Sequence, residues 1–269
     1  MAKKSSTTSG MIKQTFGFAS TQRSSRALMV AFMAAASTLL HGCDFLGSQP
    51  VGYQSQIQLA ENFLQAGDFD RAYNLFDQVD EANSRSAKVQ LALGRAYFRQ
   101  NAFLKAERAF DNASGLGEIT EAQLGLGALE LSRNNAGKAM RIFANILVED
   151  PENLRAQNGI GVAHDLNGDH YLAQVAYRNA LKIDPGHVDA ANNLGLSLTL
   201  SGSAESGASI LAELASSQIN DVTVRQNLAI SYYIIGRKEL ALDIASINFK
   251  KTEALALFEA VSNYRLSGS

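Results

Sequence analysis

The sequence predicts an all-α fold, a superhelical solenoid of about six helix–turn–helix units that is closed by a C-terminal capping helix. Two observations support this prediction. Apolar and small residues recur with a period near 34 residues from Tyr53 to Leu255. Within each unit, a Gly or Asn separates two stretches that are each long enough for a helix. One such unit cannot bury its apolar face alone, so stacked neighbours are expected to form a continuous core.

Small residues mark the contact between the two helices of a unit. The six units begin at Tyr53, Ala87, Thr120, Leu154, Val188 and Val222. The eighth position of each unit is small: Ala60, Gly94, Gly127, Gly161, Gly195 and Ala229. The twentieth position is also small: Ala72, Ala106, Ala139, Ala173, Gly207 and Ala241. We expect these positions to let the two helices approach closely.

Large side chains and turn residues complete the pattern. The twenty-fourth position fills the space between units with Phe76, Phe110, Phe143, Tyr177 and Leu211, but the sixth unit has Ala245. The fifteenth position carries residues that tolerate a left-handed backbone: Gly67, Asn101, Asn134, Gly168, Gly202 and Gly236. Because Ala245 leaves the last unit thinly packed, we expect a helix within Lys251–Leu266 to cover it.

This pattern resembles the tetratricopeptide repeat, a helix–turn–helix unit of 34 residues. The resemblance implies a right-handed superhelix of about six tetratricopeptide repeats. We place the repeats at residues 53–255 and the capping helix and tail at residues 256–269.

Residues 1–42 have the features of a lipoprotein signal peptide. They contain five cations, no carboxylate and the uncharged run Ala27–Leu40, which is shorter than the roughly 20 residues of a membrane span. The tetrapeptide Leu40-His41-Gly42-Cys43 resembles a bacterial lipobox. We therefore expect Cys43 to carry a lipid anchor and residues 43–52 to form a tether, so that the protein is anchored to a membrane without spanning it.

Composition and charge disfavour several classes of function. The chain holds 24 cations and 26 carboxylates, and since residues 1–42 take five of the cations, the remainder has a net charge of −7. Such an acidic domain does not attract nucleic acid. The single cysteine excludes an intrachain disulfide and a cysteine-rich zinc site. No catalytic arrangement or cofactor motif stands out, so we expect no enzyme, no cofactor and no small-molecule substrate.

Two motifs have alternative interpretations. Gly125-Leu126-Gly127 and Gly159-Ile160-Gly161 lack the third glycine and the preceding strand of a nucleotide-binding loop, so close helix packing explains them better. The segment His164–His170 contains side chains of metal-binding type, but it coincides with the turn of the fourth unit. We interpret it as a solvated turn in which Asp169 caps the following helix.

In this architecture the first helix of each unit lines the concave face, which suits an extended peptide or a partner helix. We predict that eight residues contact the partner: Asn158, Asn192, Asn193, Leu196, Gln226, Asn227, Ile230 and Tyr233. Asn193 and Asn227 recur at the sixth position of their units, outside the packing positions. Replacing both with alanine is therefore expected to weaken binding and to leave stability nearly unchanged.

The stretch Asn192–Arg237 resembles the TadD family, which are repeat-containing lipoproteins of the tight-adherence (Flp) pilus machinery. The similarity lies in the NNLGLSL and VRQNLA segments and in the closing Gly-Arg, and it extends to the lipobox and the repeats. It implies a non-enzymatic assembly factor that faces the periplasm and supports the outer-membrane secretin or its partners. We expect the outer membrane rather than the inner, although Asp44 after the cysteine favours inner-membrane retention in enteric bacteria.

Two other functions stay open. One is a scaffold like the pilotin of type IV pili, or another scaffold of outer-membrane biogenesis. The other is an accessory module that binds an enzyme of the cell envelope. Composition and spacing alone establish only an anchored, peptide-binding scaffold.

Overall fold

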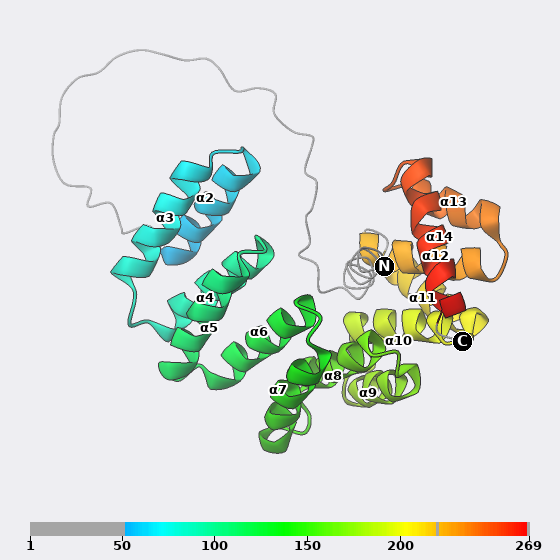
Figure 1. The fold of residues 1–269 in the computed structure, drawn as a ribbon, viewed down its shortest axis with the longest axis horizontal. Helices are drawn as coiled ribbons and strands as arrows, with labels where there is room; N and C mark the ends of the chain where they lie inside the picture. The colour runs from blue at the N-terminus through cyan, green and yellow to red at the C-terminus, as the bar shows by residue number, and fades with distance from the viewer. Residues whose placement is uncertain (1–51, 219–220, 268–269) are drawn as a thin grey trace, which may run out of the picture. The chain divides into compact units, whose positions relative to one another are not determined.

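The computed structural model describes residues 52–218 and 221–267, and within these ranges the secondary structure is helical without strands (Figure 1). The first helices of the successive pairs are α2 (Tyr53–Gln65), α4 (Ala87–Arg99), α6 (Ile119–Ser132), α8 (Leu154–Leu166), α10 (Val188–Leu200) and α12 (Val222–Ile234). Their partners are α3 (Phe69–Ala82), α5 (Phe103–Gly115), α7 (Ala136–Glu149), α9 (His170–Ile183), α11 (Ala204–Ser217) and α13 (Lys238–Ser246). The last helix is α14 (Lys251–Ser267). The predicted signal peptide and Cys43 lie outside the described residues.

The described helices belong to two compact units, one containing α2 and α3 and the other running from Ser84 to α14. In the first unit, α2 packs against α3. In the second, each helix packs against the next along the chain, and the first helices of neighbouring pairs also contact one another, from α4 to α12. The first helices therefore form a row along the inner side of this curved stack (Figure 1). We call the exposed and half-buried part of this row the inner surface.

The turns within the pairs adopt the backbone that the sequence predicted. All six turn residues have positive φ: Gly67, Asn101, Asn134, Gly168, Gly202 and Gly236. In the fourth pair, the Gly168 N–H donates to the Asp165 carbonyl (3.0 Å) and the Asp169 N–H to the His164 carbonyl (2.9 Å). These two bonds satisfy carbonyls at the end of α8, as in a Schellman motif.

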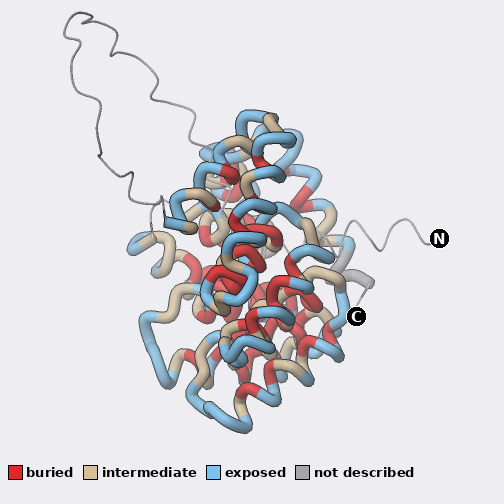
Figure 2. Tube along the Cα trace, turned by 90° about the vertical axis from the view of Figure 1, so that its left-hand side faces the viewer, coloured by how far each residue is buried: buried red, intermediate tan, exposed pale blue. Residues whose placement is uncertain are grey.

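The glycines of the first helices receive the large rings of the second helices. A Cβ atom at Gly127 would lie 2.5 Å from the ring of Phe143, and one at Gly161 would lie 2.4 Å from the ring of Tyr177. Gly159 accepts Phe143 from the preceding pair in the same way, at 2.5 Å. The Gly-Leu-Gly and Gly-Ile-Gly motifs therefore serve close helix packing, as the sequence predicted. Figure 2 shows the resulting pattern, with buried residues on the sides of the helices that face their neighbours.

The last helix covers the end of the stack. Phe258 on α14 is buried, and its ring stacks on that of Tyr233 with centroids 4.5 Å apart. It supplies the bulk that Ala245, itself buried, does not provide. The helix begins at Lys251, within the segment Lys251–Leu266 where a covering helix was expected and five residues before the assigned start of the cap, and Ala254 in its first turn is buried.

Candidate partner-binding surface

The eight residues predicted to bind a partner differ in accessibility. Gln226 and Tyr233 on α12 are half-buried. The other six are buried: Asn158, Asn192, Asn193, Leu196, Asn227 and Ile230. The expectation that these six side chains are accessible to a partner was therefore wrong for the described structure. Their role in binding stays a prediction.

Four of the buried asparagines form a ladder that joins three first helices. The Asn193 side-chain amide on α10 donates to the Asn158 side-chain oxygen on α8 (3.0 Å). The Asn227 amide on α12 donates to the Asn192 oxygen on α10 (2.9 Å). Within α10, the Asn192 amide reaches the Asn193 oxygen at 3.4 Å, which connects the two links. In both links the fifth position of one unit accepts from the sixth position of the next.

A second set of polar links runs parallel to the asparagine ladder. The Ser197 hydroxyl on α10 donates to Asp165 on α8 (2.7 Å). The Thr199 hydroxyl on α10 lies 2.7 Å from the Ser231 hydroxyl on α12. In both cases the twelfth position of one unit bonds to the tenth position of the next. Buried polar groups need such partners, so these links fix α8, α10 and α12 in one mutual register.

The ladder changes the expected result of replacing Asn193 and Asn227. The Asn193→Ala, Asn227→Ala variant leaves the buried oxygens of Asn158 and Asn192 without their donors, and such a loss costs about 1–3 kcal/mol per group. We now expect the free energy of unfolding to fall by at least about 2 kcal/mol. Chemical denaturation followed by circular dichroism measures this. A variant as stable as the parent would show that these hydrogen bonds do not stabilise the fold. Asn193 and Asn227 would then be expected to act in binding alone.

The last turn of α8, just before the turn of the fourth pair, contains a buried carboxylate rather than a solvated one. Asp165 is fully buried and accepts hydrogen bonds from Tyr177 (2.8 Å), Ser197 (2.7 Å) and His170 Nδ1 (2.7 Å). Burial raises the pKa of Asp165, and the bonds from its three partners, which act to lower it, do not offset this. The prediction of a solvated turn was wrong for Asp165, because α8, α9 and α10 meet at this point.

The predicted cap at Asp169 also differs. Asp169 occupies the N-cap position of α9, but its side chain makes no capping hydrogen bond. Its carboxylate lies 3.9 Å from His164 Nδ1 instead.

Within the described ranges, no three His, Cys, Asp or Glu side chains are grouped so that they could hold a metal ion.

Exposed charges mark the inner surface where α4, α6 and α8 lie side by side. The Glu121 carboxylate on α6 accepts from the guanidinium of Arg155 on α8 (2.6 Å) and from that of Arg95 on α4. The two arginine side chains are about half exposed, at 53% and 46%. Burial acts to raise the pKa of Glu121, but hydrogen bonds and charge from Arg155 and Arg95 outweigh it and lower the pKa. Two cations on one carboxylate leave a net positive charge here.

The link through Glu121 was not predicted from the sequence. The sequence did contain a signal for this link, because the opposite charges of Arg95, Glu121 and Arg155 stand 26 and 34 residues apart, close to the repeat period.

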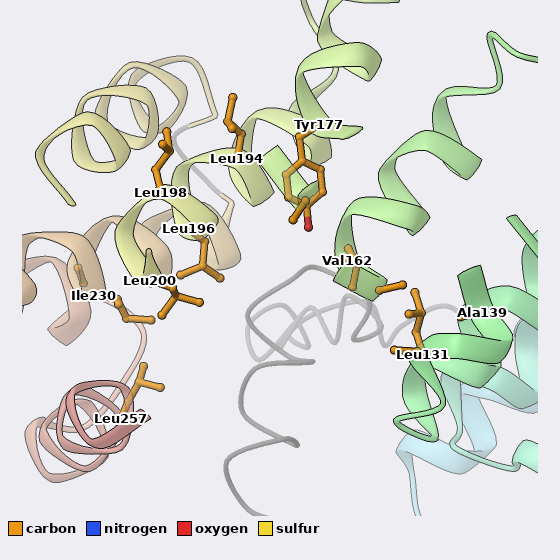
Figure 3. Close-up of a cluster of buried hydrophobic side chains, with 14 of the residues drawn as sticks. Leu131, Ala139, Val162, Tyr177, Leu194, Leu196, Leu198, Leu200, Ile230 and Leu257 are labelled. Carbon is orange, nitrogen blue, oxygen red and sulfur yellow. The ribbon is translucent and has the colours of Figure 1, made fainter. Parts of the chain in front are cut away.

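Farther along the row, apolar side chains gather where α10, α12 and α14 meet. Figure 3 shows Leu196, Leu200, Ile230 and Leu257 together at this point, and all four are buried. The inner surface is thus basic at one end and backed by a packed apolar cluster at the other.

Family comparisons agree with this geometry. Models of the tetratricopeptide repeat match residues 63–115, 91–153 and 154–187. The fold is a tetratricopeptide-repeat array. Solenoids of this kind generally act as scaffolds that bind other proteins. No curated protein matches the chain in sequence.

Solved structures with the same fold are distant in sequence. PilW, described as a widely conserved type IV pilus biogenesis factor, is 15% identical, with a TM-score of 0.60 over 76% of this chain and 98% of its own. A thermophilic tetratricopeptide-repeat protein from Thermus thermophilus, TTC0263, is 14% identical, with a TM-score of 0.56 over 68% of this chain and 100% of its own. The Cut9–Hcn1 complex gives 16% identity and a TM-score of 0.62 over 80% of this chain and 44% of the other. At these identities the likeness establishes the fold alone.

Among the helices of residues 52–218 and 221–267, none is both long and apolar enough to cross a membrane.

Proposed function

We propose that the protein is a non-enzymatic scaffold that binds a protein component of a pilus assembly machine through the inner surface. The observation that carries this proposal is the row of first helices, in which side-chain links hold α8, α10 and α12 in register. A surface fixed in this way binds a partner without first becoming ordered, which lowers the entropic cost of association. The exposed Arg95 and Arg155 suit a partner segment that carries carboxylates.

The assignment to pilus assembly has two supports. The segment Asn192–Arg237 resembles the TadD lipoproteins of the tight-adherence pilus. The similar fold of PilW, a type IV pilus biogenesis factor, is compatible with a related role. On this basis we propose the secretin, or another component of the machine, as the partner. A pilotin-like scaffold of type IV pili, another outer-membrane biogenesis scaffold and a module that binds an envelope enzyme are the alternatives.

We also propose that Cys43 anchors the protein by a lipid to the periplasmic side of a bacterial membrane, the outer rather than the inner. Cys43→Ala is expected to abolish incorporation of radiolabelled palmitate, because the chain has no other thiol to accept a lipid. Equal labelling of the variant and the parent would exclude the lipoprotein assignment.

Site-specific photo-crosslinking in the native bacterium tests the proposed partner. A photoreactive residue at Arg95 or Arg155 is expected to form a crosslink to a secretin or another pilus component, identified by mass spectrometry. The control is Arg141, an exposed residue on the second helix α7, which should not form that crosslink. Crosslinks to the same protein from Arg141 alone would move the binding site off the inner surface. Crosslinks only to an envelope enzyme would favour the accessory module.

A further inference from the structure

The solvent-facing side of α9 carries apolar side chains, whereas hydrogen bonds to Asp165 hold the side of α9 that packs against α8. Tyr171 is 75% exposed and Val175 is 39% exposed. On the opposite side, His170 and Tyr177 both bond to the buried Asp165. The helix is therefore fixed in the stack, and its apolar outer side chains have no partner within that packing. Tyr171 and Val175 lie one helical turn apart and so form a small exposed apolar patch on α9.

Charges continue this outer face in a regular order. Arg178 and Lys182 are exposed and follow Tyr171 and Val175 at spacings of three or four residues, so all four lie on one side of α9. The helix contains no carboxylate. We call these four residues the α9 stripe, which consists of two apolar side chains followed by two cations.

The outer face of α3 has the same order with the opposite charge. Phe69 is 58% exposed and Tyr73 is 40% exposed, and the exposed Asp77 and Glu81 follow at spacings of four residues. We call these four residues the α3 stripe. Arg71 is the cation of this helix. It pairs with Asp68 and lies 4.7 Å from the centroid of the Phe63 ring.

We propose that the α9 stripe of one copy of the protein binds the α3 stripe of a second copy. With the two helices parallel, Phe69 and Tyr73 meet Tyr171 and Val175, while the two carboxylates meet the two cations. Burial of the apolar side chains supplies the attraction, and the charges set the direction. This contact lies outside the inner surface and goes beyond the proposed binding of a pilus component.

The symmetry of this contact has a consequence for assembly. Each copy offers one α3 stripe and one α9 stripe, so the contact is heterologous and leads to a ring or an open chain of copies. A second copy is favoured over a lipid surface or an unrelated acidic protein because the matching stripe is present in the same chain. A lipid surface or an acidic protein would bind the α9 stripe without any need for the α3 stripe.

Charge reversal in the full-length protein tests the proposal. Two copies with different affinity tags are co-expressed in the native bacterium and solubilised in mild detergent, and capture of one by the other is measured. When both copies carry Asp77→Lys with Glu81→Lys, or both carry Arg178→Glu with Lys182→Glu, capture should fall at least about ten-fold because like charges face each other. Chains with all four substitutions should regain capture to within about two-fold of the parent.

Matched controls separate this contact from general effects of charge or hydrophobicity. Arg108→Glu with Arg141→Glu, on the exposed sides of α5 and α7, changes the net charge of the protein by the same amount as the reversal of the α9 stripe. This control should leave capture unchanged. Tyr171→Ser with Val175→Ser should lower capture, whereas Leu104→Ser, which changes a side chain that is 79% exposed on α5, should not.

Three results would overturn the proposal. One is the absence of capture between two parental copies, and another is undiminished capture between two copies with the same reversed stripe. The third is loss of capture on reversing the α9 stripe alone, with capture kept on reversing the α3 stripe, which would assign α9 to a different occupant. Photo-crosslinking at Arg95 reports on the inner surface separately, so failure of self-association does not affect the proposed function.

Discussion

Replacing Phe143 with alanine is expected to lower the free energy of unfolding by about 3–5 kcal/mol. Its ring is buried and lies between Gly127 on α6 and Gly159 on α8, so it fills the space between the third and fourth pairs. The two glycines carry no side chain that could move into the vacated volume. The cavity therefore stays largely open, and its cost adds to the lost burial of the ring.

The loss should be local as well as large, because each pair in a repeat array contacts only its neighbours. Urea denaturation gives the free energy, and amide hydrogen exchange should increase mainly in α6, α7 and α8. Val148→Ala on the same helix is the control, since that side chain is 77% exposed and its loss should cost less than about 0.5 kcal/mol. If the two variants melt alike, the assigned register of the repeats is wrong.

Replacing Asp165 with alanine is expected to cost about 3–5 kcal/mol, because it leaves several hydrogen-bonding groups unsatisfied at about 1–3 kcal/mol each. The carboxylate accepts three hydrogen bonds, from His170, Ser197 and Tyr177, and its removal leaves buried donors without an acceptor. Because the donors come from α9 and α10, the packing of both helices on α8 should loosen. Asp169→Ala, on the exposed part of the same turn, is the control and should have an effect below about 0.5 kcal/mol.

The raised pKa of Asp165 gives this prediction a pH dependence. A carboxyl group whose pKa is raised in the folded state binds its proton more tightly there than in the unfolded chain. Its contribution to stability is therefore complete below its ordinary pKa of 3.8 and decreases as the pH rises through the folded value. The stability of the parent relative to Asp165→Asn should accordingly fall with rising pH above about 3.8. A difference that rises with pH would show that the buried carboxylate is stabilised by its charge.

Local sequence determined where the helices of this protein begin, turn and approach each other. A left-handed backbone is accessible to Gly and Asn at little cost, so the six turn residues could be identified without knowledge of any contact. The glycines at Gly127 and Gly161 likewise indicated close packing against a large residue sixteen positions later. These features depend on one residue and its near neighbours in the same repeat, and the period displays them repeatedly.

The accessibility of the polar side chains was decided by tertiary structure. Asn193 and Asn227 stand at positions that are compatible with a solvent-facing side chain, yet both are buried. Their partners lie 35 residues away on the preceding first helix. Whether an asparagine faces water or a neighbouring amide depends on the rotation and spacing of adjacent repeats, which no single repeat encodes.

Asp165 shows the same limit most clearly. Its neighbours in the sequence, with two histidines and a glycine, suggested a solvated turn, whereas three helices enclose the carboxylate. The repeat, its turns and its glycine contacts could thus be predicted from the sequence, because they follow from backbone preference and side-chain size within about 34 residues. Which polar groups are buried and paired could be seen only in the packed array, because burial depends on the surfaces that neighbouring repeats bring together.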